Sequence, residues 1–252
     1  MNMEFHLAAL IVFHLLFAAV SSPSAETLQG KVVKIADGDT VTIVDSKGFK
    51  HRIRLAGIDA PEKGQPYGGE STKNLGWLVY NKGVTIEYSK HDRYGRIIGK
   101  ILVDSGGDTF CLLIECVRKV DVGLEQIKAG MAWHYKRYQN ERSKKDRKFY
   151  SSSERGARKK QVGLWSDRKH TPPWEWRRNN KLEAISKAFK ESGLKEKVFA
   201  KRLKISPDEL KDILNEDIKN SFKASGLEAE EFAVKSNIPP DKLKKILEGE
   251  DN

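Results

Sequence analysis

The stretch that decides the fold is "GKVVKIADGDTVTIVDSKGFKHRIRLAGI", residues 30–58. Apolar and β-branched residues fill three short runs in it, in the pattern of half-buried strands. The runs are separated by Asp37-Gly38 and by a Ser46-Lys47-Gly48 segment, and both favour turns. The stretch therefore predicts three strands connected as hairpin-like pairs.

Two more strands are expected at "VTIEYSK" (84–90) and "RIIGKILVD" (96–104), after a helical segment over 69–81. Further helices are predicted from Val122 to Gly130 and, as a long basic one, over 143–161. Five short strands with a helix after the third are typical of a small closed barrel. Helix-only and parallel α/β folds fit less well. The expected fold class is α+β, with a five-stranded OB-type β-barrel and three helices in residues 26–165.

The C-terminal part contains an internal duplication. "FKESGLKEKVFAKRLKISPDELKDIL" from Phe189 matches "FKASGLEAEEFAVKSNIPPDKLKKIL" from Phe222 at a period of 33 residues. We expect a small all-α region of two helical, helix-turn-helix-like repeats over 181–252, each with a proline-started last helix. Residues 166–180, which contain Pro172-Pro173, are predicted to be a linker or wrapping tail.

The charge is unevenly distributed. The chain has 46 Lys and Arg residues against 35 Asp and Glu residues, a net charge of +11. From Lys181 onward, 15 basic and 15 acidic side chains cancel, so the excess lies before that point. A basic excess attracts polyanions, nucleic acid first and an anionic membrane surface second. The helices of the repeats either only pack against one another or also contact DNA. If they contact DNA, the first copy is the better candidate, because it has nine basic against six acidic residues.

The N-terminal segment "LAALIVFHLLFAAVSSPSA" has the pattern of a secretory signal peptide cleaved after Ala25, residues 1–25. Glu4 stands where such a peptide usually has basic residues, so an uncleaved anchor is the alternative. A cleaved signal would make the protein secreted or periplasmic, without stable membrane association. Cys111 and Cys116 would then form a disulfide or remain two small buried side chains.

Asp39 follows a tight turn at Asp37-Gly38. Strand alternation places Asp39 on the apolar side of Val41 and Ile43. A carboxylate at the rim of an apolar face is unfavourable unless a cation meets it. Asp39 is therefore a candidate metal ligand.

The segment "RLAGIDAPE", residues 54–62, adds an arginine and two acids. Arg54 alternates with apolar neighbours, so it leaves the barrel wall on the outer face, where an isolated arginine is commonly only solvated. Pro61 stiffens the turn that carries Asp59 and Glu62. If Asp39 and Asp59 lie on neighbouring strands, they can share a hard divalent cation, and Glu62 would stand off the metal and accept a proton.

The segment "HDRYGRIIG" places Arg93 and Arg96 on either side of Tyr94-Gly95 in a turn. Such a turn is commonly only a polar loop. Planar guanidinium groups are, however, the preferred partners of phosphate.

Together, "DGDT", "RLAGIDAPE", "DRYGR" and "GMAWHY" resemble the staphylococcal-nuclease-like (thermonuclease) family over about residues 29–165. The resemblance implies calcium ligands at Asp39, Asp59 and the backbone carbonyl of Ala60, where the best-known member has a threonine. It implies that Glu62 is the general base and that the phosphate is bound by Arg54 and Arg96. It also implies nucleotide contacts by Arg93, Tyr94 and, in a looser alignment, Tyr138.

The resemblance therefore implies a secreted, calcium-dependent endonuclease that cleaves DNA and RNA with little sequence preference and leaves 3′-phosphate ends. The alternative is a nuclease-like OB module that binds nucleic acid without cleaving it, but such modules have lost the acids and arginines that this chain retains. Residues 105–121 are longer than the usual turn of the family, and residues 181–252 lie outside its pattern.

Overall fold

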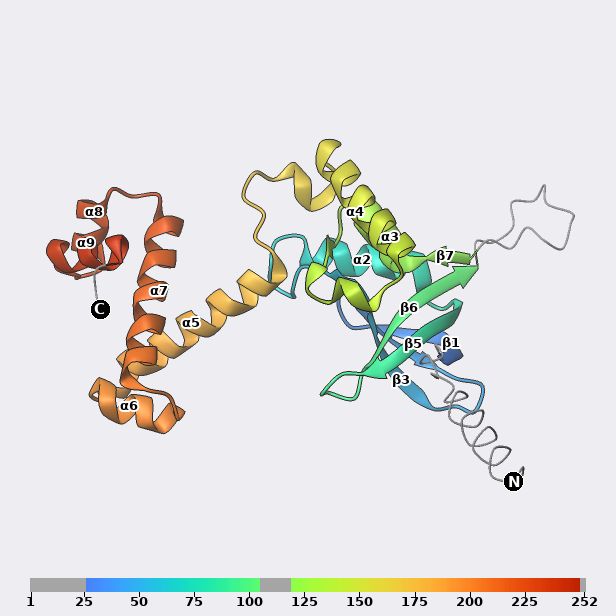
Figure 1. The fold of residues 1–252 in the computed structure, drawn as a ribbon, viewed down its shortest axis with the longest axis horizontal. Helices are drawn as coiled ribbons and strands as arrows, with labels where there is room; N and C mark the ends of the chain where they lie inside the picture. Colours follow the sequence, from blue (N-terminus) through green and yellow to red (C-terminus); the bar gives the residue numbers. More distant parts are fainter. Residues whose placement is uncertain (1–25, 105–118, 250–252) are drawn as a thin grey trace, which may run out of the picture. The chain divides into compact units, whose positions relative to one another are not determined.

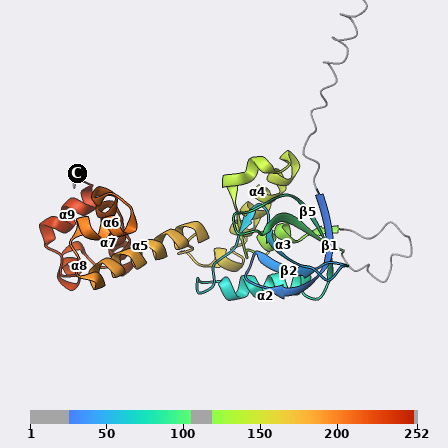
Figure 2. The same cartoon turned by 90° about the horizontal axis from the view of Figure 1, so that it is seen from below.

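The computed structural model describes residues 26–104 and 119–249, which divide into two compact units between Asp167 and Arg168 (Figures 1 and 2). The expected signal peptide, and the segment that holds Cys111 and Cys116, lie outside the described residues. Within the described ranges, no helix is long and apolar enough to cross a membrane.

The first unit is built around a closed barrel of five strands. Strand β1 (Glu26–Ile35) pairs antiparallel with β2 (Thr40–Val44) and with β5 (Gly83–His91), and β2 pairs antiparallel with β3 (Lys50–Leu55). Strand β6 (Ile97–Asp104) pairs antiparallel with β5 and parallel with β3, which closes the ring. The prediction of a five-stranded OB-type barrel is confirmed.

Three short strands that were not predicted accompany the barrel. Strand β7 (Lys119–Asp121) pairs with β6, while β4 (Ile58–Asp59) and β8 (Trp133–His134) pair with each other. The third strand was expected to continue to Ile58, but it ends at Leu55. The chain turns at Gly57, whose φ is 75°, so Asp59 lies on a separate strand.

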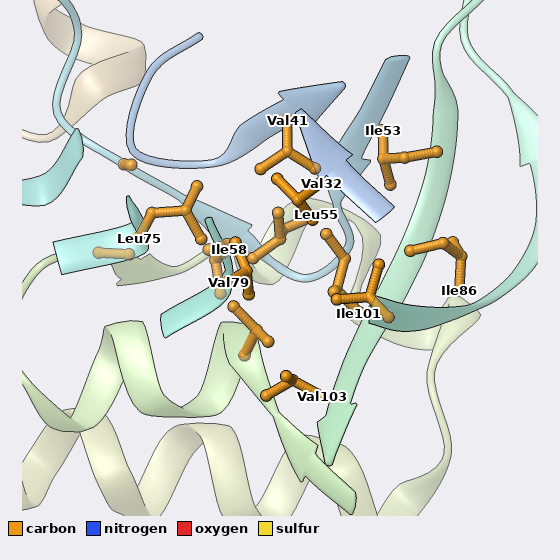
Figure 3. Close-up of a cluster of buried hydrophobic side chains, with 14 of the residues drawn as sticks. Val32, Val41, Ile53, Leu55, Ile58, Leu75, Val79, Ile86, Ile101 and Val103 are labelled. Atoms are coloured by element: carbon orange, nitrogen blue, oxygen red, sulfur yellow. The ribbon is translucent and has the colours of Figure 1, made fainter. Parts of the chain in front are cut away.

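Alternation along the strands decides which side chains fill the barrel. In β3, Ile53 and Leu55 are buried, as the predicted alternation requires, while Arg52 is exposed and Arg54 is half-buried. The interior seen in Figure 3 contains branched aliphatic side chains from all five barrel strands and from the first helix, among them Val32, Val41, Ile53, Leu55, Leu75, Val79, Ile86 and Ile101. Burial of each such side chain contributes about 1.5–3 kcal/mol, so this core stabilises the frame that carries the site.

The three expected helices of this unit are α2 (Gly68–Val79), α3 (Val122–Lys128) and α4 (Lys144–Lys159). Helix α3 contacts both α2 and α4, so the three helices lie side by side (Figure 1). Helix α3 was predicted to end at Gly130, but it ends two residues earlier, at Lys128. The chain turns at Gly130, whose φ is 67°.

Two short 3₁₀ helices complete the unit. η1 (Lys136–Glu141) leads from β8 into α4, and η2 (Gly163–Ser166) follows α4. The N-terminus of α4 is capped because the Ser143 hydroxyl accepts a hydrogen bond from the Asp146 N–H at 3.0 Å.

The second unit is helical, as expected, with α5 (Pro173–Ser192), α6 (Glu196–Leu203), α7 (Pro207–Ser225), α8 (Ala229–Lys235) and α9 (Pro240–Glu248). The first half of α7 packs with α5 and α6, and its second half packs with α8 and α9. Figure 1 shows these two groups at opposite ends of α7. One long helix therefore belongs to both repeats.

The internal duplication is seen directly in the two cores of this unit. The first core buries Phe199, Ala200 and Leu210, and the second buries the residues 33 positions later, Phe232, Ala233 and Leu243. The two repeats are thus copies of one helical module with the same buried residues.

The segment 166–180 is more regular than predicted. Pro172-Pro173 was expected to prevent regular structure, but Pro173 is the first residue of α5. Proline is tolerated at this position because the N–H that it lacks would have no partner in the helix. The carbonyl of Pro172 accepts hydrogen bonds from the N–H groups of Glu175 and Trp176, at 3.0 and 2.9 Å. The prolines therefore start a helix here.

Candidate active site

Asp39 lies in a bend immediately before β2, and its carboxylate is buried. Its Oδ1 accepts a hydrogen bond from the Thr40 hydroxyl at 2.9 Å, and its Oδ2 accepts one from the Ala60 N–H at 3.1 Å. The β2–β3 pairing extends to Asp39, whose backbone carbonyl accepts a hydrogen bond from the Leu55 N–H at 2.8 Å. The bend directs the carboxylate to the segment after β3.

Arg54 connects the two acids that were predicted to bind a metal. Its Nη1 forms an ion pair with Oδ1 of Asp39, and its Nη2 lies 2.9 Å from Oδ1 of Asp59. The Arg54 side chain is 19% exposed, against 6% for Asp39 and 0% for Asp59. Asp59 lies on β4, which pairs with β8 and not with β2. Asp39 and Asp59 therefore do not lie on neighbouring strands, contrary to the prediction. The arginine brings the two carboxylates together instead.

The charges of this cluster control its ionisation. Burial would raise the pKa of the Asp39 carboxyl, but the Arg54 guanidinium and the Ala60 N–H outweigh burial and hold this pKa below its usual range. Burial would lower the pKa of Arg54, but the charges of Asp39 and Asp59 raise it. Burial and the negative charge of Asp39 together raise the pKa of Asp37 to about 6.

The oxygen atoms of this cluster suit a hard cation. Among the residues that the structure describes, no group of three or more His, Cys, Asp or Glu side chains is arranged to hold a metal. Calcium takes roughly six to eight oxygen ligands, which include backbone carbonyls and water. Two buried carboxylates, with a carbonyl from the segment of Ala60, would therefore provide part of a calcium site. Water and substrate phosphate would have to complete it.

Glu62 lies three residues after Asp59 in the sequence, at the start of a tight turn. Its N–H donates to Oε1 of the buried Gln65 at 2.9 Å, and its carbonyl accepts from the Gln65 N–H at 2.9 Å. A Cβ atom at Gly68 would lie only 2.2 Å from the Glu62 carbonyl oxygen, so glycine is needed there. The backbone of Glu62 is thus fixed from two sides, while its side chain stays half-buried.

Arg96 is held in the hairpin between β5 and β6. Its Nε donates to Oδ2 of Asp92 at 2.7 Å, and its N–H donates to Oδ1 of the same carboxylate at 2.9 Å. The strand register relates Arg96 to the Asp39 cluster. Arg54 pairs with Ile98 across β3 and β6, so Arg96 precedes the partner of Arg54 by two residues, the spacing at which side chains share a face.

Arg93 and Tyr94 lie in the same hairpin. The Tyr94 ring is 65% exposed, and Nη2 of Arg93 donates to its hydroxyl at 2.7 Å. The guanidinium carbons of Arg93 and Arg96 lie 4.8 and 5.7 Å from the ring centroid. An exposed ring between two cations can stack on a base while the cations meet phosphate.

Tyr138 lies in η1 and is half exposed. The Lys90 ammonium lies 5.1 Å from its ring centroid, the Arg137 guanidinium lies 5.8 Å away, and the Tyr135 ring packs edge-on at 5.7 Å. This arrangement matches that around Tyr94, so Tyr138 has the surroundings expected of a base-stacking residue.

One important residue was not found from the sequence, Gln126 of α3. Its side chain is fully buried, and its Nε2 donates to the carbonyl oxygens of Gly38, at 2.6 Å, and Ser71, at 3.2 Å. A Cβ atom at Gly38 would lie 2.0 Å from the Ser71 hydroxyl, so the bend packs directly on α2. The bend before Asp39 is therefore held by two helices. A lone glutamine in an amphipathic helix carries no sequence signal of this role.

Arg142 plays a similar part at the turn that follows β3. Its side chain is 7% exposed, and its Nη1 donates to the Ala56 carbonyl at 2.5 Å. Its guanidinium carbon lies 4.0 Å from the ring centroid of Tyr150, and its Nη2 lies 3.7 Å from Oδ2 of Asp121. Arg142 thereby fixes the turn that follows Arg54 and leads to Asp59.

The chain is similar to several known proteins. The sequence model of the family described as staphylococcal nuclease homologues matches residues 52–167. A Haemophilus influenzae protein named an endonuclease is 36% identical over 168 residues, 67% of this chain and 83% of the relative. An Escherichia coli protein, also named an endonuclease, is 38% identical over 60% of this chain and 85% of its own length. A Shigella flexneri protein named micrococcal nuclease is 36% identical over 64% of this chain and 87% of its own length.

The matched range 52–167 includes Arg54, Asp59, Glu62 and Arg96, and it ends with the first unit. Asp39 precedes this range and is connected to it by its ion pair with Arg54.

Proposed function

Since the chain belongs to the staphylococcal nuclease family and is accordingly a nuclease of the hydrolase class, we propose that it is a calcium-dependent endonuclease. Its substrates would be DNA and RNA, cut with little sequence preference to leave 3′-phosphate and 5′-hydroxyl ends. The observation that carries the proposal is the buried cluster of Asp39, Arg54 and Asp59, followed three residues later by Glu62.

A phosphodiester repels hydroxide because it is itself negatively charged. Arg54 and Arg96 would neutralise the phosphate oxygens, where charge grows as phosphorus becomes five-coordinate. Asp92 binds the Nε edge of Arg96 and so orients its Nη groups. Guanidinium groups suit this task because they bind phosphate through two parallel hydrogen bonds.

Glu62 would accept the proton of the attacking water, a contribution of about 10² to 10⁴ in rate. The bond between phosphorus and the 5′ oxygen then breaks, and the 5′ oxygen takes up a proton. Calcium, when held by Asp39, Asp59 and the Ala60 carbonyl, would supply positive charge to the substrate phosphate.

The exposed tyrosines support a tolerant enzyme. Tyr94 and Tyr138 are each flanked by basic side chains, and stacking on an aromatic ring accepts any base. Contacts to phosphate likewise carry no sequence information. We therefore expect both rings to bind nucleotides without selecting a sequence.

We also infer that the protein is exported, either secreted or periplasmic, on the strength of the apolar segment that precedes Glu26. Cell fractionation followed by mass measurement of the mature chain tests this. A mature protein that begins at Glu26 supports export with cleavage, and a full-length chain in the membrane fraction supports an anchor.

The central test incubates the full chain with DNA and with RNA, in calcium and in excess EGTA. We expect cleavage of both substrates in calcium alone. The fragments should accept label from polynucleotide kinase without phosphatase treatment, because their 5′ ends are hydroxyls. Cleavage in EGTA, or fragments with 5′-phosphates, would contradict the proposal.

A matched pair of variants tests the role of Glu62. Glu62→Gln should keep the affinity for nucleic acid but lower turnover by at least about 10². Glu70→Gln, on the exposed surface of α2, is the control and should cut like the parent. Equal activity of the two variants would show that Glu62 is not the base.

A further inference from the structure

The two helical repeats share one fold but differ in charge on one exposed face. In the first repeat, Lys197, Lys201 and Lys204 follow one another at spacings of four and three residues along α6 and its C-cap. Residues at these spacings lie on the same side of a helix. All three side chains are exposed, and the opposite side of α6 buries Phe199 in the core of the repeat. We call these three residues the lysine stripe.

The second repeat has the same fold without this stripe. The positions 33 residues later are Glu230, Val234 and Asn237. Both repeats bury the same phenylalanine, alanine and leucine positions, so packing does not require lysine at any of the three sites. The stability of the module therefore does not explain the lysine stripe.

Lys204 shows this most clearly. It caps the C-terminus of α6 in the left-handed conformation, with φ of 59°. Its counterpart Asn237 has φ of 52°, and asparagine tolerates this conformation better than lysine does. The first repeat thus has the less suitable residue for the backbone, but it gains a positive charge at the end of the stripe.

The lysine stripe also has no acidic partner of its own. In the described part of the chain, none of its three ammonium groups forms an ion pair. Three other lysines of this unit do, each with a glutamate four residues away: Lys187, Lys235 and Lys244. Uncompensated, exposed and regularly spaced ammonium groups are the arrangement that binds a chain of phosphates.

From these observations we infer that the first repeat is a docking surface for the phosphate backbone of nucleic acid, and that the second repeat is not. This inference rests on the proposed function, because the polyanion in question is the substrate of the same chain. A second attachment point on one chain raises the effective concentration of the substrate at the barrel. Long nucleic acids would benefit from it, and short oligonucleotides would not.

The duplication itself provides the test. In the full chain carrying Glu62→Gln, which keeps the substrate intact, the stripe is exchanged for the residues of the second repeat: Lys197→Glu, Lys201→Val and Lys204→Asn. The second repeat already folds with these residues, so the exchange should preserve the module. The control, Lys242→Glu with Lys245→Glu, changes two exposed lysines of α9 and removes the same net charge.

Binding to a 30-base-pair duplex is measured over a series of salt concentrations, with EGTA present. The stripe exchange should weaken binding at least about tenfold at 0.1 M salt, and it should reduce the slope of log K against log salt by about 0.9 for each phosphate that the stripe neutralises. The control should change affinity less than about twofold. The reciprocal exchange, Glu230→Lys, Val234→Lys and Asn237→Lys, should strengthen binding.

Equal decreases in affinity for the stripe exchange and the control would overturn the inference, because net charge alone would then explain the effect. Unchanged affinity in both would also overturn it. Weaker binding to vesicles containing anionic lipid, with duplex binding unchanged, would assign the stripe to a membrane surface instead. Since binding is measured without cleavage, a failure of the proposed nuclease mechanism leaves this result unaffected. In the parent background, cleavage of a short oligonucleotide should be unchanged by the stripe exchange.

Discussion

Arg54→Lys tests the central cluster most directly. The guanidinium reaches Asp39 through Nη1 and Asp59 through Nη2, and a single ammonium group cannot reproduce this fork. One carboxylate should therefore lose its charge-assisted hydrogen bond. Such a bond contributes about 1.5–3 kcal/mol, and Arg54 is well enough buried for this value to apply without a large reduction for solvent.

For a unit of this size, that loss lowers the midpoint of thermal unfolding by about 3–12 °C. The assay is thermal unfolding of the full chain in EGTA, following the transition of the barrel unit. Arg52→Lys is the matched control, since Arg52 is exposed on the same strand, and it should have little effect.

Calcium provides the second arm of this experiment. If Asp39 and Asp59 bind calcium, saturating calcium should stabilise the variant and reduce its difference from the parent, because the ion gives a cationic partner to the carboxylate that the single ammonium group does not reach. An equal difference in calcium and in EGTA would refute binding at these two carboxylates. An unchanged midpoint in EGTA would refute the reasoning that Arg54 holds the cluster together.

Three further outcomes are expected. Gln126→Leu leaves the Gly38 carbonyl without its donor, so it should lower the free energy of unfolding by about 1–3 kcal/mol and slow cleavage. Urea unfolding and initial rates measure the two effects. Unchanged rates would mean that the bend needs no such support. Tyr138→Ala should raise KM several-fold and leave kcat unchanged, and a change confined to kcat would exclude a stacking role. Burial lowers the pKa of His134 below its ordinary value of 6.5, against the opposing charge of Glu154. The folded state thus prefers neutral His134, and stability should fall as pH drops below 6.5. Urea unfolding at pH 7.5 and 5.5 should show a smaller fall in His134→Gln than in the parent.

The local parts of the fold could be predicted from the sequence because their causes are local. The alternation of Ile53, Arg54 and Leu55 determines which side of the strand is buried, and the structure agrees. The 33-residue repeat predicted two similar helical modules, and their buried residues match. The acids and arginines of the site could be named because their motifs resemble those of the staphylococcal nuclease family.

What brings these residues together is decided only in three dimensions. Closure of the barrel depends on the pairing of β3 with β6, strands separated by more than 40 residues. Asp59 reaches Asp39 through Arg54 because β4 leaves the barrel to pair with β8, a partner more than 70 residues away. Gln126 supports the bend before Asp39 from a distance of 88 residues. The sequence by itself determined which groups are present and which face each strand buries, since these follow from residue type and spacing. The tertiary structure decided which groups share a site, because such contacts depend on how distant elements pack and no local pattern encodes them.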